Sequence, residues 1–201
     1  LIEHHLQTGI ETSIQEVNSH LKVAHDLFYS TGDPYIADNE TIDLNIVNEN
    51  TDEKKEVSLP LMKIDGKQIA YNYQFVDQIH NWLGSSATVY QITSDGAVRI
   101  STNILDKTGK RAIGSYIPKN SVIFKTVMDD KTYKGRVTVF GNVYQAAFEP
   151  IKNEENEIIG VLSVGVRDSS ESIMNQLSRI KIGESGYVWV VNKNGKYILS
   201  K

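Results

Sequence analysis

The sequence has 201 residues, of which 40% are hydrophobic and 23% are charged, an ordinary globular composition that suffices for one domain or for one domain and part of a second. The net charge is −4 and no cluster of lysine and arginine is visible, which argues against nucleic acid as a partner. The sequence has no cysteine, which excludes disulfides, thiolate metal ligands and cysteine nucleophiles. It also lacks a run of eighteen apolar residues and a signal-like stretch, so any membrane anchor is expected outside it.

Residues 1–31 predict one long helix. At about 1.5 Å per residue it would extend over about 40 Å, more than a compact domain of this size requires. Two interpretations are open and both can hold: the helix covers one face of a sheet, or it is a strut that pairs with a second copy of the chain. The apolar positions that recur at alternating steps of four and three residues are Leu6, Ile10, Ile14, Val17, Leu21, Ala24 and Phe28.

Catalytic and metal-binding patterns are not evident. Four of the five histidines lie in the predicted first helix, but none forms an i, i+4 pair with a third ligand nearby. No Ser–His–Asp order and no phosphate-binding loop is present. The sequence therefore predicts a protein that is not an enzyme and that has neither a metal site nor a cofactor.

Two hairpins separated by a helix follow. Residues 41–50 and 56–64 predict the first hairpin around a polar turn, and residues 87–102 predict the second around a glycine turn. Residues 73–83 predict the intervening helix, which Gly84 ends. The side of this helix that we expect to be buried carries Phe75, Val76, Ile79, Trp82 and Leu83.

An arginine lies inside the second strand of the later hairpin. Strict alternation predicts that Arg99 and Ser101 share one face of this strand, with Val98 and Ile100 on the other. Two interpretations of Arg99 are open: its side chain faces solvent, or its guanidinium points into a pocket. In a pocket, the planar guanidinium would suit a carboxylate.

A polar connection at residues 103–119 carries a second arginine, Arg111, next to the apolar pair Ala112 and Ile113. Long loops that contain apolar residues usually fold back over another part of the molecule. We therefore expect this segment to be a lid.

A short helix and three strands come next. Residues 136–140, 143–148 and 158–166 predict the strands, and their connections are too short for parallel crossovers, so they form an antiparallel meander. In the middle strand Tyr144 and Phe148 share a face, and the small alanines between them leave room for a ligand or for a crossing helix. The short helix, residues 121–129, is expected to bury Val122, Ile123, Phe124 and Val127.

The end of the sequence repeats an earlier part. Residues 183–200 repeat the pattern of residues 84–101: a glycine, a serine, a valine next to an aromatic residue, a glycine turn and a closing strand. A helical pattern precedes both segments. A second module of similar design is therefore expected to begin near Ile180 and to be cut short at Lys201.

Four segments carry a resemblance to a known family: residues 87–104, 109–117, 132–166 and 180–200. Together they resemble the Cache sensor fold, a PAS-like domain, in the tandem form in which a type 3 module precedes a type 2 module. The sequence departs from this pattern at Phe148, where tyrosine is frequent, and at Ser115, where threonine is usual. Hydroxyl contacts at these two positions are therefore in doubt.

The resemblance implies an α+β fold in which a long N-terminal helix packs on a PAS-like antiparallel sheet and a second Cache module starts. The implied organisation is residues 1–32 for the helix, 33–179 for the membrane-distal sensor module and 180–201 for the beginning of a truncated membrane-proximal module.

The implied function is the extracytoplasmic ligand-sensing domain of a transmembrane chemoreceptor of the methyl-accepting type, in the periplasm or outside the cell. The alternatives are a histidine kinase or diguanylate cyclase ectodomain, or an ectodomain that binds a partner and no small molecule. The expected ligand is an acetate- or pyruvate-like organic acid or an amino acid, and the intact receptor is expected to be a homodimer anchored through segments outside this sequence. The implied ligand-binding residues are Arg99, Tyr144, Arg111, Ser101, Ser115, Tyr90 and Phe148.

Overall fold

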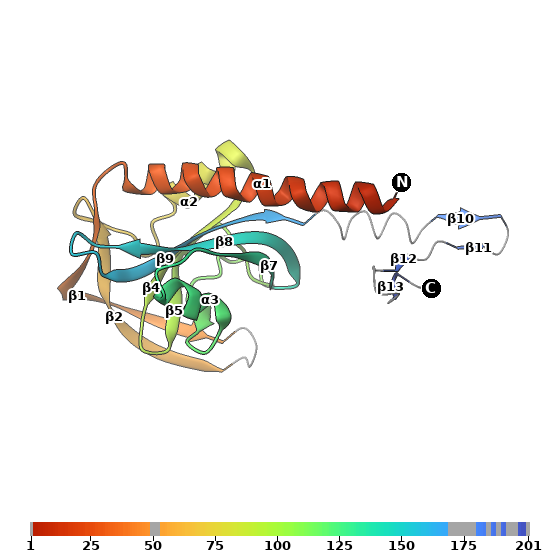
Figure 1. Ribbon diagram of the computed structural model, residues 1–201. Coiled ribbons are helices and arrows are strands. Elements are labelled where there is room, and N and C mark those ends of the chain that lie inside the picture. Colours follow the sequence, from red (N-terminus) through yellow and green to blue (C-terminus); the bar gives the residue numbers. More distant parts are fainter. Residues whose placement is uncertain are drawn as a thin grey trace. The chain divides into compact units, whose positions relative to one another are not determined.

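The computed structural model divides into two units, one formed by residues 14–167 and the other by residues 1–13 together with 168–201. Figure 1 shows its helices and strands in the colours of the sequence. Within the described residues no helix is long and apolar enough to cross a membrane. The predicted domain boundaries at residues 32 and 179 remain predictions. The residues that the structure describes are 2–48, 53–168, 180–183, 186–187, 190–191 and 197–199.

The predicted first helix is α1, Ile2–Tyr29. Val17, Leu21, Ala24 and Phe28 are buried as expected, but Ile14 is 45% exposed and Ser13 is buried in its place. A straight helix turns once per 3.6 residues, so a stripe that continues toward the N-terminus drifts away from a strict four–three pattern. The side chains of Leu6 and Ile10 lie outside the described part of the chain.

The first hairpin is longer than predicted. Strands β1 (Pro34–Val47) and β2 (Lys54–Ile64) pair antiparallel, and β3 (Lys67–Gln68) extends them to a three-stranded sheet. The predicted strand begins at Thr41, but β1 pairs with β2 from Pro34 onward, because a register shift between Ala37 and Thr41 lets the pairing continue.

The central element is a six-stranded antiparallel sheet in the order β6-β5-β4-β9-β8-β7. The predicted meander is confirmed, because β7, β8 and β9 are neighbours in sequence order. The predicted hairpin of β4 and β5 joins it through the pairing of β4 with β9. The strand bounds are β4 Ser86–Ile92, β5 Gly96–Thr102, β6 Tyr116–Pro118, β7 Tyr133–Val139, β8 Asn142–Lys152 and β9 Ile158–Arg167.

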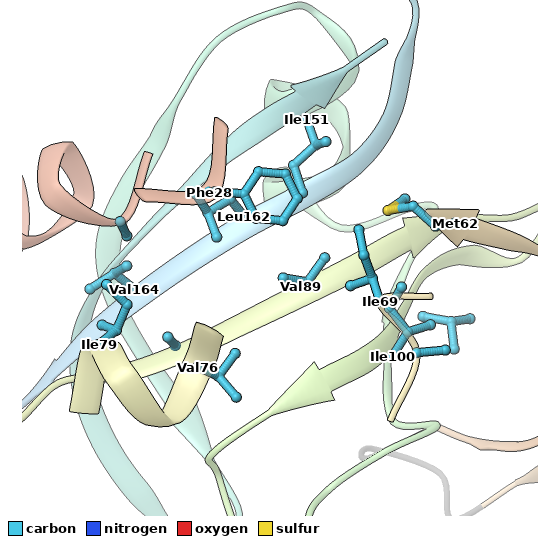
Figure 2. Close-up of a cluster of buried hydrophobic side chains, with 14 of the residues drawn as sticks. Phe28, Met62, Ile69, Val76, Ile79, Val89, Ile100, Ile151, Leu162 and Val164 are labelled. Atoms are coloured by element: carbon cyan, nitrogen blue, oxygen red, sulfur yellow. The ribbon is translucent and has the colours of Figure 1, made fainter. Parts of the chain in front are cut away.

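Each face of this sheet carries its own hydrophobic cluster. On one face, α1 and α2 (Gln74–Leu83) pack against the sheet, and Figure 2 shows Phe28 beside Leu162 and Ile79 beside Val164. We name this side the helix face. Trp82, expected to be buried on α2, is 59% exposed instead, because the buried side of the helix narrows to Val76 and Ile79.

The opposite face is covered by the shorter helix α3, Val122–Met128, and we name it the arginine face because Arg99 points to it. Phe124 and Val127 of α3 are buried here, whereas Val122, expected to be buried, is 62% exposed. Ser121 caps the helix by accepting a hydrogen bond from the Phe124 backbone N–H, and this cap places Val122 in the first turn, on the outer side.

Short strands are described near the end of the chain. Strands β12 (Val190–Val191) and β13 (Tyr197–Leu199) pair antiparallel, as the predicted repeat of the β4–β5 hairpin requires. Strands β10 (Lys181–Ile182) and β11 (Gly186–Tyr187) also pair. The helix expected before this hairpin falls on residues 169–179, outside the described part.

Polar side chains of α1 contact the six-stranded sheet and the residue before β4; the Tyr29 hydroxyl accepts a hydrogen bond of 3.0 Å from the Lys152 backbone N–H on β8. His20 Nδ1 lies 2.6 Å from Ser85 Oγ, and His25 Nδ1 lies 2.9 Å from Glu149 Oε1 on β8. Burial raises the pKa of the Glu149 carboxyl, while the hydrogen bond and the charge of His25 act in the opposite direction.

Replacing Glu149 with glutamine is therefore expected to stabilise the protein at pH 7. A raised pKa in the folded state means that folding favours the protonated carboxyl, so its contribution is complete below the ordinary glutamate pKa of about 4.3 and is lost as pH rises through the raised value. The advantage of Glu149→Gln should shrink as the pH falls from 7 to about 4, measured by urea unfolding at several pH values. A variant less stable than the wild type at pH 7 would show that the pair with His25 outweighs the effect of burial.

Candidate functional site

A β-bulge decides the direction of Arg99. Val89 on β4 pairs with Ser101, but the next residue, Tyr90, pairs with Arg99, so Ile100 is an extra residue on β5. Arg99 therefore faces the same side as Tyr90, while Ser101 faces the other side with Val89. The prediction that Arg99 and Ser101 share one face is wrong, because one inserted residue reverses the alternation beyond it.

The side chain of Arg99 is buried, at 3% exposure, so the solvent-facing interpretation is wrong. Its Nη2 donates a hydrogen bond of 2.9 Å to the hydroxyl of Tyr90, and its Nη1 donates to the hydroxyl of Ser115. The centre of the guanidinium lies 5.3 Å from the centre of the Tyr90 ring. We name Arg99, Tyr90 and Ser115 the arginine cluster.

Aromatic side chains adjoin this cluster. The ring of Phe148 lies 6.3 Å from the ring of Tyr90 and 6.1 Å from the ring of Tyr133. The ring of Phe140 lies 5.9 Å from the guanidinium of Arg99. Phe148, where the family pattern often has tyrosine, thus contributes apolar surface next to a hydroxyl that Tyr90 supplies.

The backbone before Ser115 is held between two strands. Arg99 N–H donates to Ser115 O, and Gly114 N–H donates to Arg99 O, both at 2.9 Å. On the other side, Val47 N–H of β1 donates to Gly114 O at 3.0 Å. Gly114 has a φ of +84°, and a Cβ there would overlap the backbone oxygen of Asn45, so glycine is required where β1 passes.

The segment expected to be a lid is thus fixed to the sheet edge in this structure. It also carries Arg111, whose two terminal nitrogens donate to both oxygens of Asp77 on α2 at 2.8 and 2.9 Å. The guanidinium of Arg111 lies 4.0 Å from the centre of the Tyr73 ring and also donates to Thr102 O at 2.7 Å. These partners differ from those of Arg99, and they attach the segment to α2.

Ser101 lies on the helix face. Its hydroxyl donates a hydrogen bond of 2.6 Å to Asn72 O. With Phe28 and Val89 it lines a cavity of about 200 Å³ between α1, α2 and the β2–β3 turn. The sheet therefore separates this cavity from the arginine cluster.

Tyr144 lies in an open cleft of about 290 Å³ between the β7–β8 hairpin, the C-terminal end of α2 and residues 103–105. Tyr144 pairs with Arg167 across β8 and β9, and Arg167 donates a hydrogen bond of 2.7 Å to the side chain of Asn142. Gly165 forms part of the cleft, where a Cβ would approach the Ser86 hydroxyl to 2.7 Å. We name this the hairpin cleft, because Asn142 and Tyr144 belong to the β7–β8 hairpin.

Of the seven predicted residues, Arg99, Tyr90 and Ser115 come together and Phe148 adjoins them. Tyr144 packs against the hydrophobic cluster of the same face and lines the hairpin cleft, Arg111 is paired to α2, and Ser101 is on the helix face. Sequence reasoning missed Phe140 and Arg167. An aromatic residue directly before Gly141 was a signal for Phe140, and Arg167 follows the predicted end of the last strand by one residue.

Among the described residues, no group of three or more His, Asp or Glu side chains is arranged to hold a metal ion. The arginine cluster and its aromatic neighbours offer a fixed positive charge, two hydroxyls and aromatic surface. This set suits the recognition of a small anion with a carbon skeleton.

Comparison with known proteins agrees with this architecture. No curated protein is significantly similar to the chain. The family model of the Cache 3/Cache 2 fusion domain matches residues 1–201, which is the whole sequence. The chain therefore belongs to the Cache 3/Cache 2 fusion domain family and is an extracytoplasmic sensor domain of a ligand-binding type.

Proposed function

We propose that this domain is the ligand-sensing part of a transmembrane chemoreceptor of the methyl-accepting type and that it binds a small organic acid at the arginine cluster. The observation that carries the proposal is the buried guanidinium of Arg99, whose two terminal nitrogens meet the hydroxyls of Tyr90 and Ser115. A buried arginine with this arrangement is prepared for a carboxylate, because the planar fork matches the two carboxylate oxygens.

The ligand is expected to have two to four carbon atoms. Hydroxyls both accept and donate hydrogen bonds, so Tyr90 and Ser115 can turn their protons to a carboxylate that pairs with Arg99. The rings of Phe148 and Phe140 would then pack against the carbon chain. With a ceiling of about 1.5 kcal/mol per heavy atom, acetate gains at most about 6 kcal/mol and pyruvate about 9, so affinities are micromolar or weaker.

The remaining predicted residues take other parts in this proposal. Arg111 holds the segment that carries Ser115 against α2 through Asp77. Tyr144 lines the hairpin cleft, which is separate from the arginine cluster. Ser101 contributes to the opposite face and has no part in carboxylate binding.

Signalling requires that the ligand bind one conformation of the receptor better than the other. We propose that occupancy of the arginine cluster changes the sheet and that α1, attached through His20 and His25, transmits the change. Homodimerisation of the intact receptor is part of the proposal. The same sensor function suits a histidine kinase or a diguanylate cyclase, and the output domain of the full protein distinguishes these receptors.

A thermal-shift screen of small carboxylates and amino acids tests the proposal. A specific ligand at a hundred times its Kd adds about 2.7 kcal/mol to the free energy of unfolding. For a protein of this size that corresponds to a rise of roughly 5 to 10 °C in Tm. Acetate, pyruvate and propionate are expected to raise Tm, and the matching primary alcohols and amides are the controls. Equal shifts with acids and amides, or no shift with any acid, would contradict carboxylate sensing.

A further inference from the structure

The turn between β7 and β8 has an unusual composition. Val139 pairs with Asn142, so the turn residues are Phe140 and Gly141, and their φ angles are +47° and +82°. Two positive φ angles in a two-residue hairpin are typical of a type I′ turn, which favours asparagine followed by glycine. A bulky aromatic residue at the first position is disfavoured. The sequence thus keeps phenylalanine where the local backbone prefers a small polar residue.

The position of the Phe140 ring offers a reason for this choice. Its centre lies 5.9 Å from the guanidinium of Arg99, within the range of a cation–π contact. Arg99 is buried at 3% exposure, whereas Phe140 is only partly buried. The ring therefore lies on the outer side of a buried cation and shields it from water.

The residue that follows this turn lines an open space. Asn142, two residues after Phe140, lines the hairpin cleft together with Tyr144 and Arg167. Leu105, 52% exposed, lines the cleft as well. A molecule in this cleft thus meets the turn that carries the ring covering Arg99.

We infer that Phe140 is a residue of the binding site: its ring covers the guanidinium of Arg99 in this structure and moves when an anion binds at the arginine cluster. This inference rests on the proposed function, because it takes the arginine cluster as the ligand site.

The variant Phe140→Asn separates the ring from the turn, because asparagine suits the positive φ. Its test is the rate at which methylglyoxal modifies each arginine of the whole chain, measured by mass spectrometry of peptides. The rate at Arg99 is expected to increase by about tenfold, the change that a cation–π contact of this kind is worth. The rate at Arg111 should stay the same, and Tm should not fall. Phe140→Ala should give the same increase at Arg99.

An unchanged rate at Arg99 in both variants would overturn the inference. Protection of Arg99 by pyruvate distinguishes the inference about Phe140 from the proposed function. Pyruvate is used at about 10 mM, which saturates a site with a sub-millimolar Kd. If pyruvate protects Arg99 in the wild type but neither variant changes the rate, carboxylate binding stands and the role of Phe140 is refuted. If the variants raise the rate but pyruvate gives no protection, the cover by Phe140 stands and carboxylate binding is refuted.

Discussion

Replacing Arg99 with lysine is expected to weaken the binding of pyruvate by about 10- to 100-fold. Lysine keeps the positive charge but presents one compact ammonium in place of a planar fork, so it loses the paired geometry toward the two carboxylate oxygens. It also cannot reach the hydroxyls of Tyr90 and Ser115 at the same time with the geometry of Nη1 and Nη2. The loss corresponds to about 1.4 to 2.8 kcal/mol, in the range of hydrogen bonds to charged groups. Isothermal titration calorimetry measures it.

The matched control is Arg111→Lys. This substitution also replaces a guanidinium with an ammonium, but its partner is Asp77 on α2 and its stacking ring is Tyr73. The pair is partly exposed to solvent, so the expected loss of stability is about 1 kcal/mol or less, with pyruvate affinity changed by no more than about threefold. A similar loss of affinity in both variants would show that the site does not distinguish the two arginines. No loss in Arg99→Lys would remove Arg99 from the site.

Replacing Gly114 with alanine is expected to destabilise the domain by roughly 2 to 4 kcal/mol and to weaken ligand binding as well. Two effects add: the φ of +84° disfavours any residue with a Cβ, and the added carbon would overlap the backbone oxygen of Asn45. The backbone must then move away from β1. Ser115 is the next residue, so its hydroxyl moves away from Arg99 at the same time. Urea unfolding and calorimetry measure the two effects.

Gly109 provides the control for the backbone preference alone. It lies in the same segment with a nearly equal φ of +80°, but a Cβ there would have no atom within 4 Å. Gly109→Ala should therefore lower stability by about 1 kcal/mol and leave pyruvate affinity unchanged. Equal effects of the two substitutions would show that the passage of β1 does not constrain Gly114.

Much of the candidate site could be predicted because its residues lie in strands whose alternation is local. Tyr144 and Phe148 are an even number of residues apart, so they share a face wherever β8 lies in the sheet. Arg99 stood out because it interrupts an apolar strand, although the sequence left open whether its side chain faces solvent or a pocket. The sequence could not predict that Arg99 and Arg111 have different partners. Asp77 pairs with Arg111 only because α2 packs beside residues 103–115.

The remaining errors have the same origin. Ser101 was assigned to the wrong face because the residues around Ile100 do not indicate a β-bulge. Ile14 and Trp82 were assigned to the core because both continue an apolar stripe, yet the surfaces that α1 and α2 meet do not extend that far. Phe140 was overlooked because its neighbour Arg99 is far away in the sequence.

The sequence by itself determined the kinds of element, their order and the antiparallel connection of neighbouring strands, because hydrophobic period, turn residues and loop length act over a few residues. Only the tertiary structure decided which side chains meet: the bulge that turns Arg99 toward Tyr90, the passage of β1 against Gly114 and the ring of Phe140 beside the guanidinium. These contacts join segments far apart in the chain, and their geometry depends on single-residue shifts of register that no local pattern encodes.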